Sequence, residues 1–232
     1  MEKFLLDNLE FKVDLDALFE AIRMDKTDDD AETVIKMARE AEAIARPKAL
    51  YMVSYIDEKG DDYVVIDGVK FVSHVMSVNL KDAHRVFPYV ATCGVELENW
   101  SNSIEDVLEQ YWADVIKIQA LQHASKAIDI HLENCFKIGK TASMNPGSLE
   151  DWPISEQEKL FRVLGDAREK TGVVLTDSFL MVPIKSVSGI KFPTESNYEN
   201  CRLCKRENCP GRRAPYDEEL ASKYGLFFSK RL

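Results

Sequence analysis

The sequence predicts an α+β fold with a mostly antiparallel sheet, and three observations predict it. Two apolar stretches flank Lys59-Gly60-Asp61, a turn sequence that is typical of a β-hairpin. Residues from about 104 to 136 have the apolar spacing of one long helix. Hairpin patterns and long helical patterns follow one another along the chain, without an internal repeat.

The N-terminal half begins with helical patterns and continues with strands. Residues 14–24 have helical spacing, and a second helix follows the acidic run at 28–30 and extends to about Ala45. Acidic residues in a first turn complement the helix dipole, and Pro47 ends this second helix. Gly94 closes the last strand of this half. The predicted strands are residues 49–57, 62–66, 69–73 and 86–92.

The C-terminal half contains the long helix, a loop and a shorter helix. The first half of the long helix is apolar on several sides, which predicts a central position, and Gly139 is its expected stop. A loop at 143–148 follows. Ser155-x-x-Glu158 is a capping box that predicts a helix to about Lys170, with Gly172 as its C-cap. Further strands are expected at residues 173–175, 178–184 and 186–192.

Composition limits the class of protein. The chain has 232 residues, 45% of them hydrophobic, which is enough for one large domain or two small ones. The formal net charge of −10 argues against general nucleic-acid binding. No apolar stretch has the length of a signal peptide or a membrane span. Five cysteines, an odd and clustered set, argue against a secreted disulfide framework. We therefore expect a cytoplasmic protein with reduced or metal-bound thiols.

The most informative motif is Cys201-x-x-Cys204-x4-Cys209-Pro210, within a basic segment near the C-terminus. Three thiolates at this spacing suit an iron–sulfur cluster or zinc. A proline directly after the last cysteine is also common in iron–sulfur motifs. The alternative is a reduced tail without metal. We expect a body at residues 1–198 and a cysteine-rich basic tail at residues 199–232. A fourth ligand is open between Cys93, Cys135, a histidine, a water and a second chain.

Other reactive side chains have simpler interpretations. Cys93 at a strand end and Cys135 on the long helix are expected in the core. His123 and His131 share a helix face two turns apart, too far for one ion. The pair Arg212-Arg213 either clamps a phosphate or an acidic partner or is exposed surface.

Residues 84–198 resemble the reactivation domain of cobalamin-dependent methionine synthase. The landmarks occur in the family's order: the run from Val86 to Gly94, the long helix, the loop with Pro146-Gly147, the stretch 176–183, and Ser186-Val187-Ser188-Gly189. The resemblance implies a C-shaped, twisted antiparallel sheet flanked by helices. It also implies binding of S-adenosylmethionine and docking on a corrinoid protein, whose inactive Co(II) receives one electron and a methyl group.

The resemblance further implies the residues of a ligand site. These are Asn145, Pro146 and Gly147 in the loop, Ser188, Gly189 and Lys191 in the last strand, and Glu133 or Asp129 on the long helix, which would hold the ligand's amine. The family's Arg-x-x-x-Gly-Tyr loop has Ser143 and Ser148 here in place of its arginine and tyrosine. A cation that pairs with a carboxylate is thereby missing.

Two functions follow. The first is an accessory protein for a corrinoid-dependent methyltransferase, which supports reduction of Co(II) to Co(I) through an iron–sulfur cluster on the three cysteines. If it is an enzyme, its activity is reductive methylation of, or electron transfer to, the corrinoid. The second is a non-catalytic docking module for a corrinoid protein, with a structural zinc in the tail and S-adenosylmethionine binding lost. A third possibility keeps this ligand on the Pro146-Gly147 backbone, Asn145 and Lys191.

Overall fold

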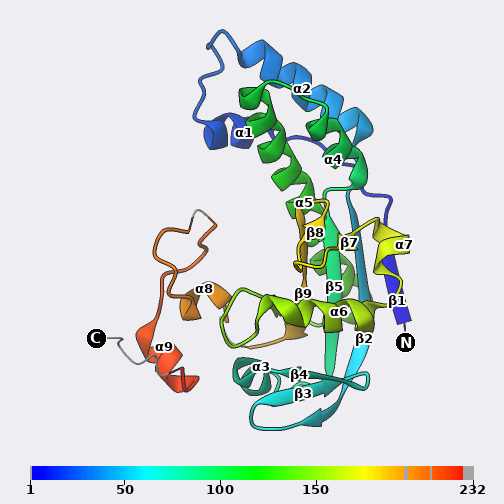
Figure 1. The fold of residues 1–232 in the computed structure, drawn as a ribbon, viewed down its shortest axis with the longest axis vertical. Helices are drawn as coiled ribbons and strands as arrows, with labels where there is room; N and C mark the ends of the chain where they lie inside the picture. The colour runs from blue at the N-terminus through cyan, green and yellow to red at the C-terminus, as the bar shows by residue number, and fades with distance from the viewer. Residues whose placement is uncertain (1, 196–197, 210, 227–232) are drawn as a thin grey trace.

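In the computed structural model of the protein, residues 2–195, 198–209 and 211–226 are described, and Pro210 of the cysteine motif lies outside the described residues. The described part is a mixed α+β fold around one antiparallel sheet (Figure 1). This confirms the predicted fold class. The strands of the sheet are β1 (Glu2–Leu6), β2 (Lys48–Lys59), β3 (Tyr63–Ile66), β4 (Val69–Val72), β5 (Arg85–Thr92), β6 (Thr141–Met144) and β9 (Ser186–Pro193).

Strand β2 is the longest strand and organises the sheet. The strand order is β4-β3-β2-β5-β9-β6, and β1 also pairs with β2. A register shift between Ile56 and Glu58 marks a bulge in β2. Strand β1 pairs with residues 49–53 of β2, and β3 pairs with residues 56–59. Every pair in the sheet is antiparallel, as the hairpin pattern predicts.

The longest helix, α5, has clear end signals. The Asp106 carboxylate accepts hydrogen bonds from the first-turn N–H groups of Leu108 and Glu109, and Lys137 ends the helix in the left-handed conformation. The helices are α1 (Leu15–Ile22), α2 (Ala31–Ile44), α3 (His74–Asn79), α4 (Val95–Asn102), α5 (Val107–Phe136), α6 (Gln157–Leu164), α7 (Ala167–Thr171), α8 (Asn200–Leu203) and α9 (Glu218–Lys223), with a 3-10 turn η1 (Ile154–Glu156) and a small hairpin of β7 (Val174–Leu175) and β8 (Met181–Val182).

Helices cover both faces of the sheet, and consecutive residues of its central strands, which point to opposite faces, are therefore all buried. Tyr51 of β2 faces α5, where it joins a core cluster with Ile128 and Leu132. Its neighbour Leu50 faces the other side and packs in the largest core with Leu164 of α6. The long helix is therefore central, as predicted.

A third core lies at one end of the molecule. Helices α1, α2 and α4 surround the N-terminal half of α5, where Trp112 and Ile116 are buried. Figure 1 shows these helices at one end and β3, β4 and α3 at the other, with α8 and α9 at the side, so the outline is an open C.

Two predicted helices differ from the observed ones. The long helix starts at Val107 and not at 104, after Asp106 has capped it. The helix expected at 155–170 is divided into η1, α6 and α7, because Gly165 adopts a positive φ of 70° and ends α6. Ser155 lies inside the 3-10 turn, and Glu156 takes the N-cap position of α6 in place of the predicted capping box.

Several predicted strand and loop boundaries were also wrong. The strand expected at 178–184 is limited to Met181–Val182, because Thr176 to Leu180 form a turn closed by the bond from Thr176 N to Leu180 O (2.8 Å). Ser143 and Met144 belong to β6 and not to a loop. The sequence analysis did not identify β1, β6, α3 or α4 as elements.

The described part of the tail packs against the body. Leu203 of α8 and Ala221 of α9 are buried in the same core cluster as Ile190 and Phe192 of β9. Within the described residues, the helices are too short or too polar to cross a membrane.

Candidate functional site

A cavity of about 430 Å³ lies between the loop that follows β6 and the segment that follows α8. Cys201, Cys204 and Cys209 all line this space, which we call the cysteine cavity. Gly147 and Ser148 of the predicted ligand loop also line it. Two motifs that are more than 50 residues apart in sequence therefore share one cavity. Its other lining residues are Asn200, Arg206, Gly211 and Arg213.

The ligand loop has a fixed conformation. Gly147 N donates to Trp152 O (2.8 Å), and Ser148 N donates to Asn145 O (3.1 Å). Gly147 has a φ of 80°, and a Cβ at this position would lie 2.9 Å from Ile154 Cδ1. Glycine is therefore required here both by the backbone conformation and by the space.

Asn145 connects the loop, the sheet and the tail. Its Nδ2 donates to the Tyr89 hydroxyl (2.8 Å) and to the Ser188 carbonyl (2.9 Å), and its Oδ1 accepts from Asn200 Nδ2 (3.2 Å). Gly189 makes this approach possible, because a Cβ there would lie 2.6 Å from Asn145 Nδ2. The predicted residues Asn145, Ser188 and Gly189 thus meet as a structural unit.

Arg212 hydrogen-bonds to several backbone carbonyls of the cysteine segment, by which we mean the described residues of 199–214. Its Nη1 donates to the carbonyls of Cys201 and Ala214 (3.1 Å each). Its Nη2 donates to the carbonyl of Cys204 (3.2 Å) and to that of Arg206. Because the guanidinium of Arg212 already donates to these backbone carbonyls, it is not free to bind a phosphate as the sequence analysis considered.

One backbone group faces the thiols directly: the N–H of Arg213 points at Cys201 Sγ, at 3.5 Å. Among the described residues, however, no three His, Cys, Asp or Glu side chains are arranged to hold a metal ion. The three cysteines share a cavity wall without converging on one point.

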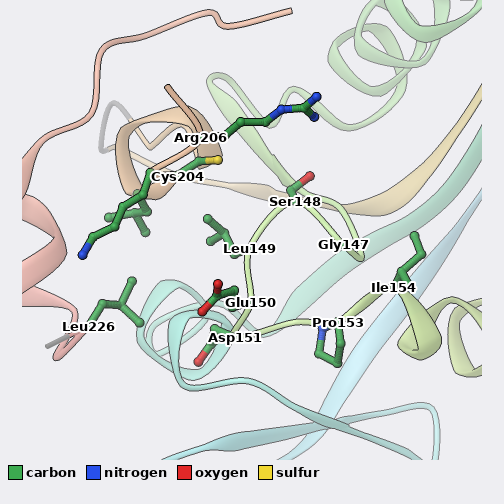
Figure 2. Close-up of a pocket in the computed structure, with 12 residues that line it drawn as sticks. Gly147, Ser148, Leu149, Glu150, Asp151, Pro153, Ile154, Cys204, Arg206 and Leu226 are labelled. Carbon is green, nitrogen blue, oxygen red and sulfur yellow. The ribbon is translucent and has the colours of Figure 1, made fainter. Parts of the chain in front are cut away.

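A second, larger cavity of about 880 Å³ adjoins the first. The two share Gly147, Ser148, Cys204 and Arg206. Figure 2 shows the loop running through this space, with Arg206 and Ser148 at one end and Asp151 at the other. The remaining lining residues are Leu149, Glu150, Pro153, Ile154, Leu203, Lys205 and Leu226.

Of the predicted ligand residues, Gly147 lines these two cavities, whereas the lining residues do not include Asn145, Pro146, Ser188, Gly189, Lys191, Asp129 or Glu133. Lys191 Nζ forms an ion pair with Asp129 Oδ1 at 2.6 Å and lies 5.5 Å from the centre of the Tyr89 ring. Asp129, rather than Glu133, therefore faces the last strand. The Glu133 carboxylate accepts a hydrogen bond from Gly139 N (2.9 Å) at the end of α5.

The other cysteines lie away from the cysteine cavity. Cys93 is buried, as predicted, and burial raises the pKa of its thiol to about 12. Cys135 is exposed, so its predicted core position was wrong; its helix face points to solvent, with Sγ 3.7 Å from the His131 ring nitrogens. Among its described lining residues, the cavity offers no histidine, acid or further cysteine as a fourth ligand.

Sequence reasoning missed the residues that join the tail to the body. Asn200 and Tyr89 complete the hydrogen bonds of Asn145, and Gln157 Nε2 donates to Ser188 Oγ (3.0 Å). Arg206 lines both cavities. The only available signal was the position of Asn200 and Arg206 within a few residues of the cysteines.

The family described as "Vitamin B12 dependent methionine synthase, activation domain" matches residues 147–212, a range that includes Gly147 and Ser148 at the end of the loop and the three cysteines. This confirms the resemblance seen in the sequence. A search among curated proteins gives no match.

Comparison with solved structures confirms the fold. Among the matches is the crystal structure of the MetH reactivation domain bound to AdoHcy (S-adenosylhomocysteine), with a TM-score of 0.58 and 14% sequence identity. The match covers 86% of this chain and 81% of that chain. At this identity the likeness concerns the fold.

Proposed function

We propose that this protein supports reductive reactivation of a corrinoid carried by a partner protein in a methyltransferase system. One observation carries the proposal: Gly147 and Ser148 share a cavity with Cys201, Cys204 and Cys209. The activation-domain family matches both segments in one continuous range. Reactivation requires a small-molecule site and a redox centre. The loop would provide the first, and the three thiols beside it could hold the second.

The donor set fits a thiolate-bound metal in its chemistry. Cys201, Cys204 and Cys209 would hold the metal, and the Arg213 N–H would support the thiolate of Cys201. An iron–sulfur cluster would supply one-electron transfer at low potential, whereas zinc would supply structure alone. The Arg212 guanidinium holds the chain segment that carries these thiols.

S-adenosylmethionine is the small molecule that we assign to the loop. The related crystal structure is of a domain bound to AdoHcy, and here Gly147 lines both cavities from a rigid turn, in which its N–H is bonded to Trp152 O. Ser143 does not replace the missing arginine, because it lies in β6, paired in register with Lys191.

The test is the metal content and the spectra of protein purified without oxygen. We expect iron and sulfide, a brown colour and a reducible paramagnetic signal. The reduced protein should then change the absorbance of a Co(II) corrinoid protein. Protein without iron after anaerobic reconstitution, and without effect on the Co(II) spectrum, would contradict the proposal.

The alternative is a docking module with a structural zinc. The observation that favours it is the ion pair of Lys191 with Asp129 at 2.6 Å. Lys191 is the cation in the last strand that could have bound a ligand carboxylate, and Asp129 neutralises it. This alternative predicts one zinc per chain and no S-adenosylmethionine binding. Tight binding of one ligand per chain in calorimetry would exclude it.

A further inference from the structure

Of the four arginines in the cysteine segment, three have partners for their side chains and Arg206 is the exception among the described residues. Arg202 forms an ion pair with Asp217 at 2.6 Å, and Arg213 forms one with Glu199 at 3.0 Å. Arg212 is bound to backbone carbonyls. Within the part of the chain that the structure describes, the Arg206 side chain has neither an ion pair nor a hydrogen bond.

Arg206 stands where the two cavities meet. It lines the cysteine cavity and the larger cavity, and so does Ser148. Figure 2 shows its side chain extending on the side of the loop where Ser148 lies. Its backbone is held in place because Arg212 Nη2 donates to the Arg206 carbonyl. The guanidinium of Arg206 therefore extends from a backbone position that Arg212 holds in place.

The charges around Arg206 favour an anion. No described residue that lines the cysteine cavity is acidic. The carboxylates of the larger cavity, Glu150 and Asp151, lie at the opposite end of the loop from Arg206 (Figure 2). Asp151 is also engaged, since it accepts hydrogen bonds from the backbone N–H groups of His74 and Val75.

We propose that Arg206 binds the carboxylate of a small-molecule ligand, whose bulkier body occupies the larger cavity. A guanidinium matches a carboxylate with two parallel hydrogen bonds. The larger cavity, at about 880 Å³, has the size of a small-molecule site and offers Leu149, Pro153 and Ile154 to an apolar or aromatic ring. The inference rests on the proposed function and deepens it, because the cysteine segment then supplies the cation that the loop lacks.

Two probes that differ in the carboxylate test this assignment. S-adenosylhomocysteine has a nucleoside and an amino-acid carboxylate, and methylthioadenosine has the same nucleoside without the amino acid. We expect the wild-type protein to bind S-adenosylhomocysteine more tightly in calorimetry. Arg206→Ala should weaken this binding by about 10- to 100-fold, the effect of a lost charge-assisted hydrogen bond, and leave methylthioadenosine binding unchanged.

Two further variants separate the role of Arg206 from general effects. Arg206→Lys keeps the charge without the paired geometry and should show an intermediate loss. Arg39→Ala removes the same charge from an exposed position on α2 and should bind both probes as the wild type does. Circular dichroism and metal content, measured on the same preparations, report the fold and the proposed metal site independently of ligand binding.

Three results would overturn the proposal: no binding of S-adenosylhomocysteine by the wild type, equal losses for both probes in Arg206→Ala, or unchanged affinity in that variant. Each of them leaves the proposed function testable by iron content and by the Co(II) spectrum. If iron and an effect on the Co(II) spectrum were both absent but binding still depended on Arg206, the ligand site would be supported and the proposed redox function would not.

Discussion

Asn200 Nδ2 donates a hydrogen bond to Asn145 Oδ1 at 3.2 Å, and this contact joins the cysteine segment to the ligand loop. Asn145 in turn holds the Ser188 carbonyl of β9 and the Tyr89 hydroxyl of β5. The central strands, the loop and the tail are therefore linked through one amide side chain. The loop is thereby tied to α8, where the cysteines begin.

Replacing Asn145 with alanine should destabilise the fold. The variant leaves the Ser188 carbonyl without its side-chain donor in a buried region, and such a loss costs about 1–3 kcal/mol in the free energy of unfolding. Urea denaturation measures this change. Asn99→Ala, on an exposed face of α4, is the control and should differ from wild type by less than about 0.5 kcal/mol. Equal stability of wild type and Asn145→Ala would show that the network contributes nothing.

Replacing Arg212 with alanine should loosen the cysteine segment. The side chain binds the carbonyls of Cys201 and Cys204 from one point, which no shorter side chain can do. We expect faster backbone hydrogen exchange over residues 201–209 and weaker zinc binding in a competition titration. Arg213→Ala is the control, because this neighbouring guanidinium also lies at the cysteine cavity but pairs with Glu199 and not with the cysteine carbonyls. Similar exchange in both variants would contradict the organising role of Arg212.

Local patterns in the sequence predicted much of the fold. The hairpin at Gly60 and the central helix α5 depend on apolar periodicity and turn residues that lie close together in sequence, whereas pairs such as β5 with β9 join strands far apart in the chain. The division of the helix at Gly165 was missed, because a single glycine also occurs inside continuous helices. Strand β6 was missed because its sequence, Thr-Ala-Ser-Met, lacks the run of β-branched and aromatic residues that marks β3 and β4.

The site was predicted in part, for a different physical reason. Cys201, Cys204 and Cys209 form a local motif, and Gly147 lies in a family-like loop, so each was identified alone. Their shared cavity depends on tertiary packing of α8 on the sheet, which sequence spacing does not encode. The role of Arg206 became visible only after the partners of the neighbouring arginines were known.

Lys117→Met should be strongly destabilising. Lys117 and Glu98 are 4% and 6% exposed, and Lys117 Nζ lies 3.1 Å from Glu98 Oε2. Removal of the lysine leaves a buried carboxylate without its cation, which costs about 3–5 kcal/mol. The double variant with Glu98→Gln should recover part of this loss in denaturation experiments. A double variant that is no more stable than Lys117→Met would show that charge burial is not the cause.

Cys93 should make the stability of the protein depend on alkaline pH. Burial raises the pKa of its thiol to about 12 in the folded state, whereas an unfolded thiol ionises near a pKa of about 8.5. A raised pKa stabilises the fold fully below the unfolded value, and this contribution is lost as the pH rises toward the folded value. The stability of wild type relative to Cys93→Ala should therefore decline between pH of about 8.5 and about 12. A constant difference, measured with reductant present, would contradict this.

Serine variants of the three clustered cysteines should lose metal, whereas serine at Cys135 should not. Cys201, Cys204 and Cys209 line one cavity, and a serine hydroxyl is a much poorer ligand than a thiolate for iron or zinc. Because three ligands are few, loss of any one should remove most of the bound metal. Cys135 is exposed on α5 and lies outside the cysteine cavity, so Cys135→Ser controls for the loss of an accessible thiol.

The measurement is metal per chain after anaerobic reconstitution, with thermal unfolding as a check on the fold. Equal metal content in all four variants would place any bound metal elsewhere, whereas loss from Cys135→Ser as well would indicate binding between chains or at scattered thiols.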